Sequence, residues 1–160
     1  MSYALVTGAS KGIGKEIAAE LASRKYNLLL VARSEELLQK VAFELKSRYK
    51  VEVDYLAIDL AQIGVAQQEY DWVNSKNYEV SILVNNAGYG LVGPVGHYSI
   101  EKNRDMMTLN MLTLTEMCQT FLPMLKRQSK SYIMNIASST AYQALPHMAI
   151  YAATKVFEIG

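Results

Sequence analysis

Tyr151 and Lys155 are the residues whose types and spacing point most directly to chemistry in this sequence. Residues four apart on a helix lie on one face, a turn from each other. An ammonium beside a phenol favours the phenolate, because the positive charge stabilises the negative one. Ser138 stands thirteen residues before Tyr151, and its hydroxyl, delivered from a nearby strand end, could hydrogen-bond the same reacting oxygen. These three side chains predict a proton-transfer site for a carbonyl or an alcohol.

Short apolar strands and helices alternate along the chain and would position these side chains. The predicted strands are 3–7, 28–32, 51–58, 80–84 and 132–137. The predicted helices are 15–24, 35–49, 62–75, 100–127 and a last one that starts at Ile150. Strands that are apolar on both faces and alternate with helices are typical of a doubly wound parallel sheet. Without this frame, the Tyr-x-x-x-Lys spacing could also be a chance pair on a half-exposed helix face.

Two local signals mark helix ends and irregularities. Ser34 is a candidate N-cap for the helix 35–49, whose first turn carries Glu35 and Glu36 where the positive end of the helix dipole favours acidic residues. Pro123 falls inside the helix 100–127. Because proline has no N–H and its ring clashes with the preceding turn, we expect it to kink this helix or to end its regular part.

Length and composition favour one soluble globular domain over residues 1–160. The chain is 51% hydrophobic and 19% charged, which suits a packed core rather than disorder. A net charge of +1 gives no reason to expect nucleic acid or an anionic membrane as a partner. No apolar run approaches membrane-spanning length, and the first strand starts too close to Met1 for a signal peptide. The single cysteine, Cys118, cannot form an internal disulfide, so we expect a cytoplasmic protein.

A glycine-rich loop joins the first predicted strand to the first predicted helix and contains Gly8, Gly12 and Gly14. A helix N-terminus offers free N–H groups and a partial positive charge, and a glycine backbone can approach a pyrophosphate closely. The spacing Gly-x-x-x-Gly-x-Gly differs from the Gly-x-Gly-x-x-Gly of the standard dinucleotide fold. A tight turn without a ligand is the alternative. We favour nucleotide binding, because the loop lies where doubly wound folds bind nucleotides.

The end of the second predicted strand indicates which nucleotide would bind. An acidic residue at this place accepts hydrogen bonds from the ribose 2′-hydroxyl of NAD, whereas an arginine accommodates the 2′-phosphate of NADP. This chain has Arg33 there and Lys11 in the glycine loop. Two cations near one ribose favour NADPH. Arg33 alone could be a solvated residue before a helix, but that reading explains the pair less well.

Five motifs together, in their order and spacing, resemble the short-chain dehydrogenase/reductase family. They are the loop Thr7-Gly8-Ala9-Ser10-Lys11-Gly12-Ile13-Gly14, the run Asn85-Asn86-Ala87-Gly88, Asn110, Ser138, and Tyr151-x-x-x-Lys155. The resemblance extends from Tyr3 to the last residue. It implies an α/β, Rossmann-like fold with a doubly wound parallel sheet, strand order 3-2-1-4-5 and helices on both faces.

The resemblance also implies catalytic roles for four residues. Tyr151 would be the general acid that protonates the carbonyl oxygen while hydride arrives from the nicotinamide. Lys155 would favour the phenolate and bind the nicotinamide ribose. Ser138, rather than its neighbour Ser139, would hold the substrate oxygen, because Ser138 has the family's spacing to Tyr151. Asn110 would bend the long helix and hold a water in the proton relay to Lys155.

The cofactor implied by the resemblance is NADP(H), held along one edge of the sheet. Its binding residues would be Gly8, Ser10, Lys11, Gly12, Ile13, Gly14, Arg33, Ser34, Asp59, Leu60, Asn86, Ala87, Gly88, Tyr151 and Lys155. Asp59 would contact the adenine amine, although a sole role as the N-cap of the following helix fits about as well. Asn86, Ala87 and Gly88 would line the ribose side, and the asparagine motif would also tie neighbouring strands together.

The remaining polar and apolar candidates carry weaker signals. His97 and His147 sit in loops without partners at metal-ligand spacing, so we predict no metal site. Loop residues after strand ends are mostly apolar and suggest a carbonyl substrate with apolar groups, such as an acyl chain; they are Tyr89, Leu91, Val92, Tyr142, Leu145 and Met148. The long helix carries methionines that we assign to core or helix packing, with a few as candidates for a dimer contact; they are Met106, Met107, Met111, Met117 and Met124.

The chain departs from the family in its length. Family members continue past the Tyr-x-x-x-Lys helix with further strands and a substrate lid, and this sequence stops at Gly160. We therefore expect the last strand to be an exposed edge. One hypothesis is an NADPH-dependent carbonyl reductase, active as a homo-oligomer, of which this chain is a truncated product or a recorded part. The alternative is a non-catalytic dinucleotide-binding or self-association module.

Overall fold

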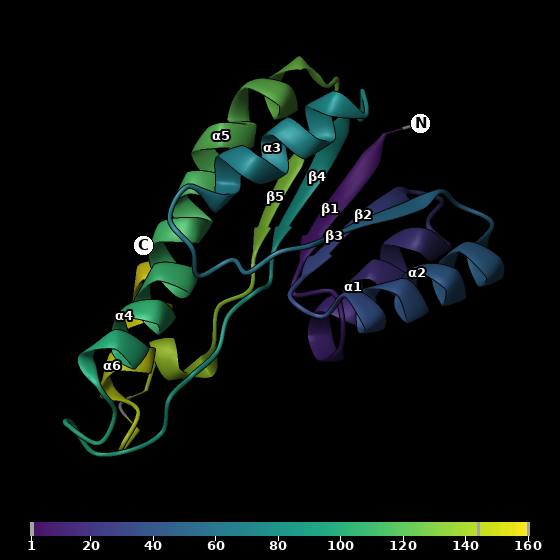
Figure 1. Cartoon of the computed structure of the whole chain (residues 1–160). Helices are drawn as coiled ribbons and strands as arrows, with labels where there is room; N and C mark the ends of the chain where they lie inside the picture. The colour runs from purple at the N-terminus through teal and green to yellow at the C-terminus, as the bar shows by residue number, and fades with distance from the viewer. Residues whose placement is uncertain (1, 144, 160) are drawn as a thin grey trace.

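The chain is described by a computed structural model that covers residues 2–143 and 145–159 (Figure 1). Its strands are β1 (Tyr3–Thr7), β2 (Asn27–Ala32), β3 (Val53–Ala57), β4 (Val80–Asn85) and β5 (Tyr132–Asn135). Its helices are α1 (Gly12–Ser23), α2 (Glu35–Tyr49), α3 (Val65–Ser75), α4 (Ile100–Met107), the π-helix η1 (Thr108–Thr113), α5 (Leu114–Arg127), the 3-10 turn η2 (Ser139–Ala141) and α6 (Ala149–Phe157). The predicted elements are therefore present, with ends that move by three residues or fewer.

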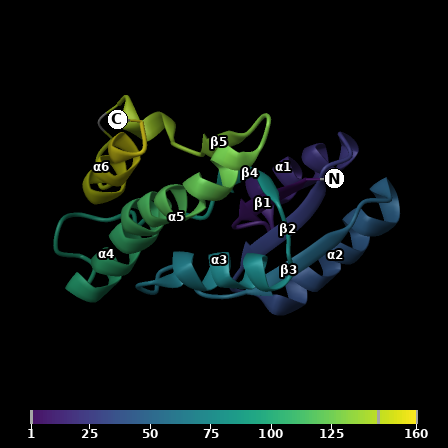
Figure 2. The same cartoon turned by 90° about the horizontal axis from the view of Figure 1, so that it is seen from above.

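The strands form one parallel sheet in the order β3-β2-β1-β4-β5, which confirms the predicted fold and strand order. Helices α1 and α2 cover one face of the sheet, and α3 and α5 cover the other (Figures 1 and 2). The chain runs outward from β1 to β3 and then crosses back to β4. This reversal leaves a crevice beyond the carboxyl ends of β1 and β4, where doubly wound sheets bind ligands.

The core consists of two apolar layers, one on each face of the sheet. In β2, Leu28 and Leu30 pack toward α1 and α2, whereas Leu29 and Val31 pack toward α3 and α5. This alternation follows from the two-residue period of a strand. All four side chains are fully buried. Because burying a side chain of this size stabilises the fold by about 1.5–3 kcal/mol, the central strands fix the edge of the sheet that carries the candidate site.

Strand β5 lies at the edge of the sheet and pairs with β4. It ends at Asn135 rather than at the predicted residue 137, and all four of its residues are exposed. Tyr132, Ile133 and Met134 are each more than 40% exposed. The expectation of an exposed last strand in this chain is confirmed.

The long helix is interrupted around Asn110, where the resemblance implied a bend, and not at Pro123. Pro123 lies inside α5, which continues to Arg127, so the proline does not end the regular helix. The irregular part is instead η1, where six residues from Thr108 to Thr113 adopt π-helical geometry. A π-segment adds a residue to the turn and often occurs at functional sites. Ser34 occupies the N-cap position of α2, as predicted. Its side chain makes no cap hydrogen bond, so the predicted capping interaction is absent.

Glu69 is a carboxylate inside the apolar layer between α3 and the sheet. It shares the buried face of α3 with Val65, Ala66 and Val73. Its side chain is fully buried, and neither carboxylate oxygen has a hydrogen-bond partner among the described residues. Because burial penalises the charged form, the pKa of Glu69 rises from its ordinary 4.5 to about 8.

Glu69 predicts a specific pH dependence of stability. A raised pKa means that the folded state holds the proton more tightly, so stability is highest below about pH 4.5 and falls as the pH rises toward 8. Glu69→Gln cannot ionise, so its free energy of unfolding should lack this pH dependence. Relative to wild type, the free energy of unfolding of the variant should therefore rise by roughly 4–5 kcal/mol between pH 4.5 and 8. Urea unfolding at a series of pH values measures this difference. Parallel stability curves for the two proteins would contradict an uncharged Glu69.

Candidate active site

One cavity of about 540 Å³ runs along the carboxyl ends of the parallel strands. Its volume is in the range of small-molecule and cofactor sites. All but one of the predicted cofactor residues line it: Gly8, Ser10, Lys11, Gly12, Ile13, Arg33, Ser34, Asp59, Leu60, Asn86, Ala87, Gly88, Tyr151 and Lys155. Gly14 is buried and does not line the cavity. The other lining residues were missed from the sequence; they are Ala32, Leu37, Ile58, Leu109, Ile136 and Ala137. Tyr89 lines the cavity too, and the sequence analysis assigned it to the substrate side.

The glycine loop is packed against the loop that follows β4. Gly8 adopts φ +67°, and a Cβ built there would lie 2.7 Å from Asn86 Nδ2. A Cβ at Gly14 would lie 2.5 Å from the carbonyl oxygen of Gly8. Only glycine fits these two positions, because the backbones approach too closely for a side chain. Gly12 has φ +58° with open space around it, so a ligand can reach the backbone there.

The N-terminus of α1 points its free N–H groups into this loop. Lys11 occupies the N-cap position, and its side chain makes no cap hydrogen bond to the first turn. Helix α1 is twelve residues long, and its aligned peptide dipoles place a partial positive charge at this end. Together with the open space at Gly12, these groups form a cradle that fits a pyrophosphate.

Thr7 and Asn86 lock β1 to the loop after β4. The Thr7 hydroxyl accepts hydrogen bonds from the backbone N–H groups of Asn86 and Ala87, both at 3.0 Å, and donates to the carbonyl of Val84 at 3.2 Å. The Asn86 amide donates back to the Thr7 carbonyl at 2.9 Å and to that of Gly8 at 3.3 Å. These bonds hold the glycine loop against the Asn-Asn-Ala-Gly loop.

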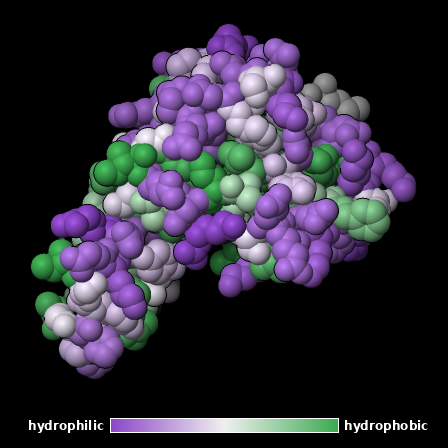
Figure 3. All heavy atoms as spheres, viewed as in Figure 1, coloured by the Kyte–Doolittle hydropathy of each residue, from purple (hydrophilic) through white to green (hydrophobic). Residues whose placement is uncertain are grey.

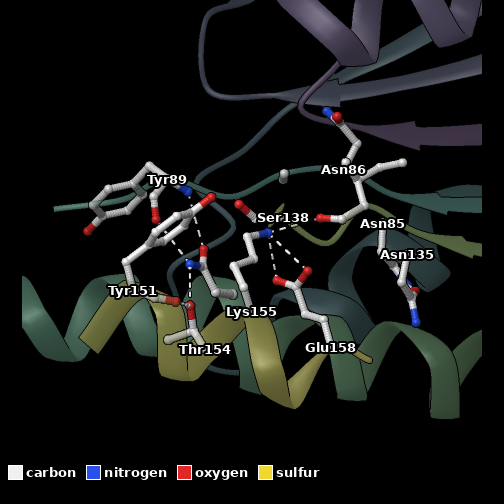
Figure 4. A network of polar contacts seen from close by, with 12 residues as sticks. Asn85, Asn86, Tyr89, Asn135, Ser138, Tyr151, Thr154, Lys155 and Glu158 are labelled. Atoms are coloured by element: carbon white, nitrogen blue, oxygen red, sulfur yellow. Dashed lines mark hydrogen bonds and ion pairs between the residues drawn. The ribbon is translucent and has the colours of Figure 1, made fainter. Parts of the chain in front are cut away.

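Asn85 makes the equivalent tie between β4 and β5. Its amide donates to Asn135 Oδ1 at 3.0 Å (Figure 4). The same amide donates to Cys118 Sγ at 3.3 Å. The structural role expected for the asparagine motif is therefore present in the contacts of both Asn85 and Asn86. Cys118 is half-buried and free, and burial raises the pKa of its thiol.

Lys11 and Arg33 line the same cavity, as their pairing in the sequence predicted. Arg33 follows β2, and Lys11 precedes α1, so both cations flank the crevice on the β2 side. Asp59 and Leu60 line this cavity as well. Its carboxylate accepts a hydrogen bond from the backbone of Ala61 at 3.1 Å, and the N-cap of α3 is Gly64. The alternative role of Asp59 as N-cap of this helix is therefore wrong.

Asn110 joins the π-helix to α6 and to the loop after β4. Its side chain is fully buried. The amide nitrogen donates to Tyr89 O at 3.0 Å and to Thr154 Oγ1 at 2.9 Å, and the amide oxygen accepts from Tyr89 N at 3.2 Å. The helix is irregular around this residue, as the resemblance implied. The side chain itself holds protein groups, and its part in a water relay stays a prediction.

Tyr151 and Lys155 lie on the same face of α6 and both face the cavity (Figure 4). The Lys155 ammonium lies 5.9 Å from the centre of the Tyr151 ring. It donates to Ile136 O at 3.0 Å and to both carboxylate oxygens of Glu158, at 2.7 and 3.0 Å. The residue is only 5% exposed, so its charge is weakly screened by solvent.

Two glycines make room for this pair on the opposite wall. A Cβ at Gly88 would lie 3.0 Å from Asn110 Oδ1 and 3.4 Å from Lys155 Nζ. A Cβ at Gly90 would come within 3.0–3.2 Å of the Tyr151 ring. The absence of side chains at both positions lets α6 approach the loop after β4.

Ser138 is the N-cap residue of the turn η2, three residues after the end of the edge strand β5, and Figure 4 shows it in the same close-up as Tyr151 and Lys155. Its hydroxyl accepts hydrogen bonds from Thr140 Oγ1 at 2.9 Å and from Thr140 N at 3.2 Å. These bonds fix the direction of the hydroxyl oxygen. Ser138 does not line the cavity that holds the predicted cofactor residues.

The apolar loops expected to face a substrate enclose little space. Leu91 and Ile150 line a cavity of about 20 Å³ between the loop 89–99 and α6. Val92, Tyr142 and Leu145 are exposed. His147 contributes its backbone carbonyl to this contact, accepting from Gly93 N at 2.8 Å. Within residues 2–143 and 145–159, no cluster of His, Cys, Asp or Glu could hold a metal ion.

The methionines of the long helix separate into two groups. Met106, Met117 and Met124 are buried, as expected for packing. Met107 and Met111 instead line a groove of about 380 Å³ on the outside of α4 and η1. Figure 3 shows hydrophobic side chains along the outer edge of the lobe that α4 and α6 form in the view of Figure 1. In the described part of the chain, no helix is both long and apolar enough to cross a membrane.

Comparison with known proteins decides the family. The family model for short chain dehydrogenases matches residues 2–160. The chain belongs to the short-chain dehydrogenase family. Members that resemble it include the very-long-chain 3-oxoacyl-CoA reductase-A of Danio rerio, 36% identical over 97% of this chain, and the human very-long-chain 3-oxoacyl-CoA reductase, 34% identical over 97%. The chain spans about half the length of these two relatives, 49% and 50%.

Solved structures of short-chain dehydrogenases superpose closely on the chain. The alcohol dehydrogenase of Thermococcus sibiricus, complexed with 5-hydroxy-NADP, is 32% identical with a TM-score of 0.92, over 99% of this chain and 67% of that one. The L-sorbose reductase of Gluconobacter frateurii, complexed with NADPH and L-sorbose, is 30% identical with a TM-score of 0.91, over 97% and 59%. The short-chain dehydrogenase relatives are oxidoreductases, and the fold of this chain is theirs.

The glycine loop yields a testable prediction about packing. Gly14→Ala places a methyl group against the backbone of Gly8, which has nowhere to move, so we expect a loss of about 1–3 kcal/mol in the free energy of unfolding. Gly64→Ala is the matched control outside the site, because Gly64 has φ +77° and open space around it. In the control, the only cost is that of placing a Cβ in the left-handed backbone region, about 1–2 kcal/mol.

Cofactor affinity separates the two variants more clearly than stability. Gly14→Ala should weaken NADPH binding, measured by calorimetry, because the loop must shift to relieve the contact. Gly64→Ala should bind NADPH as wild type does. Unchanged NADPH binding by Gly14→Ala would show that the tight packing of this loop is not required for the site.

Proposed function

We propose that this chain forms the cofactor-binding and catalytic part of an NADPH-dependent reductase that converts an apolar carbonyl compound to an alcohol. One observation carries the proposal. A single cavity is lined by the glycine loop and two cations at one end and by Tyr151 and Lys155 at the other. A dinucleotide that spans this cavity would present its nicotinamide to the Tyr151 hydroxyl.

The choice of NADPH is supported by the charges around the β2 end of the cavity. Lys11 and Arg33 are the cations there, and the residue that follows β2 is not acidic. A 2′-phosphate would place its negative charge between them. The N-terminus of α1 and the open backbone at Gly12 would hold the pyrophosphate. Solved relatives complexed with NADPH or an NADP derivative support the same choice.

The reaction proposed for Tyr151 is proton transfer to the carbonyl oxygen. When bound, NADPH supplies the hydride that adds to the carbonyl carbon. The Tyr151 hydroxyl gives its proton to the oxygen, which completes the alcohol and leaves a phenolate. The nearby Lys155 ammonium stabilises that phenolate. Ser138 would hold the substrate oxygen by hydrogen bonding, and Asn110 would support the relay that restores the Tyr151 proton.

The proposed substrate class is an apolar ketone or a 3-oxoacyl thioester. Exposed apolar side chains on the loops beside α6 support this choice; they include Val92, Tyr142 and Leu145. The relatives named very-long-chain 3-oxoacyl-CoA reductase support it as well. A cytoplasmic location is part of the proposal and is supported by the single free cysteine, Cys118.

We also propose that the protein works as a homo-oligomer. The support is the apolar groove on α4 and η1, where Ile100, Met107 and Leu112 are each more than 40% exposed. The same surface, with the exposed strand β5, favours the second candidate function, a self-associating module that binds the dinucleotide without turnover. Light scattering would measure the oligomeric state. A monomer at all accessible concentrations would contradict the oligomer in either case.

Tyr151→Phe distinguishes the reductase from the non-catalytic module. The variant keeps the ring but lacks the proton donor, so we expect reduction of a long-chain 3-oxoacyl thioester to fall at least about a hundredfold. NADPH affinity should stay within about twofold of wild type, because the lost hydroxyl contributes at most one hydrogen bond to the cofactor. The measurements are NADPH consumption and a calorimetric binding constant. Turnover by Tyr151→Phe at the wild-type rate would refute the acid role, and turnover by neither protein would favour the module.

A further inference from the structure

Lys155 is held by a buried ion pair that leaves none of its donors free. Its ammonium donates to both oxygens of Glu158, at 2.7 and 3.0 Å, and to the Ile136 carbonyl at 3.0 Å (Figure 4). A lysine ammonium has three N–H donors, so these acceptors use all of them. Glu158 belongs to none of the motifs identified in the sequence.

This ion pair differs from the other ion pairs in the described part of the chain. Its side chains are 7% and 2% exposed, whereas both partners of every other pair are at least 31% exposed. Exposed pairs are screened and contribute little, but a buried pair interacts strongly through the low local dielectric. Burial raises the pKa of the Glu158 carboxyl, and the hydrogen bonds from Lys155 act in the opposite direction.

The pairing follows from local geometry. Lys155 and Glu158 are three residues apart at the end of α6, which places them side by side on the helix surface. The space around the ammonium is small, because the backbones of Gly88 and Ile136 approach it from the sheet. The carboxylate therefore shares the same enclosed position as the ammonium.

We propose that Glu158 competes with the nicotinamide ribose of the cofactor for the Lys155 ammonium and so sets the affinity for the nicotinamide half of NADPH. The inference rests on the proposed function, in which Lys155 donates to that ribose. A ribose hydroxyl can accept from Lys155 only when one of these three contacts opens, and two of them go to the Glu158 carboxylate, which is a stronger acceptor than a hydroxyl. Glu158 is thus a positioning residue that acts through Lys155.

The competition is confined to one end of the cavity. Helix α6 contacts α4, η1 and η2, on the β5 side of the sheet. Lys11 and Arg33, which would hold the 2′-phosphate, lie on the β2 side. A ligand that occupies only the β2 side, such as 2′,5′-ADP, should not sense Glu158. A ligand that also carries the nicotinamide ribose should.

The test compares NADPH with 2′,5′-ADP on the full chain by calorimetry. Glu158→Gln has the same shape but frees one Lys155 donor and removes the competing charge. We expect it to bind NADPH about five- to tenfold more tightly than wild type, with 2′,5′-ADP affinity within about twofold. Glu20→Gln is the matched control, because Glu20 pairs with Arg24 at 60% and 67% exposure on the helix surface. It should leave both affinities unchanged.

The other outcomes separate this inference from the proposed function. Unchanged or weaker NADPH binding by Glu158→Gln, with normal 2′,5′-ADP binding, would overturn the competition and leave the proposed cofactor site standing. An equal change for both ligands would show a general effect of charge or fold and would also overturn it. Failure of the wild-type chain to bind either ligand would overturn the proposed function, and the inference with it.

Discussion

The structure depends on the close approach of two loops at the centre of the sheet, where β1 and β4 end side by side. The Thr7 hydroxyl and the Asn86 amide tie these loops with a reciprocal set of hydrogen bonds. The approach is possible because Gly8 and Gly14 have no side chain to separate the backbones. This contact forms the floor of the cavity and directs the N-terminus of α1 toward it. The phosphate cradle therefore lies at the place where the chain crosses back from β3 to β4.

A second constraint places the chemistry at the far end of the cavity. Helix α6 is held by Asn110 through Thr154, and Asn110 in turn holds the backbone of Tyr89. The π-helical segment turns Asn110 inward to make these bonds. The position of Tyr151 and Lys155 depends on this buried amide and on the hydrogen bond from Lys155 to the Ile136 carbonyl just beyond β5.

Local patterns in the sequence predicted much of this arrangement. The helix Glu35–Tyr49 and the strand Tyr3–Thr7 have the predicted ends, because periodicity and flanking residues fix them locally. The resemblance implied a bend at Asn110, but its π-helical form could not be predicted, since it depends on contacts between Asn110 and residues that are distant in sequence. Of the two roles left open for Asp59, the N-cap role was wrong because α3 starts later, after Gly64. Glu158 belongs to no motif, and its role could be inferred only from its ion pair with Lys155 in the structure.

The central claim is that this chain holds a working site for NADPH, and a calorimetric titration of the 160-residue protein with NADPH and then NADH tests it most directly. The account predicts saturable binding of one NADPH per chain, at least about tenfold tighter than NADH, because Lys11 and Arg33 flank the place of the 2′-phosphate. A folded sample that binds neither nucleotide, or binds NADH as tightly as NADPH, would contradict it.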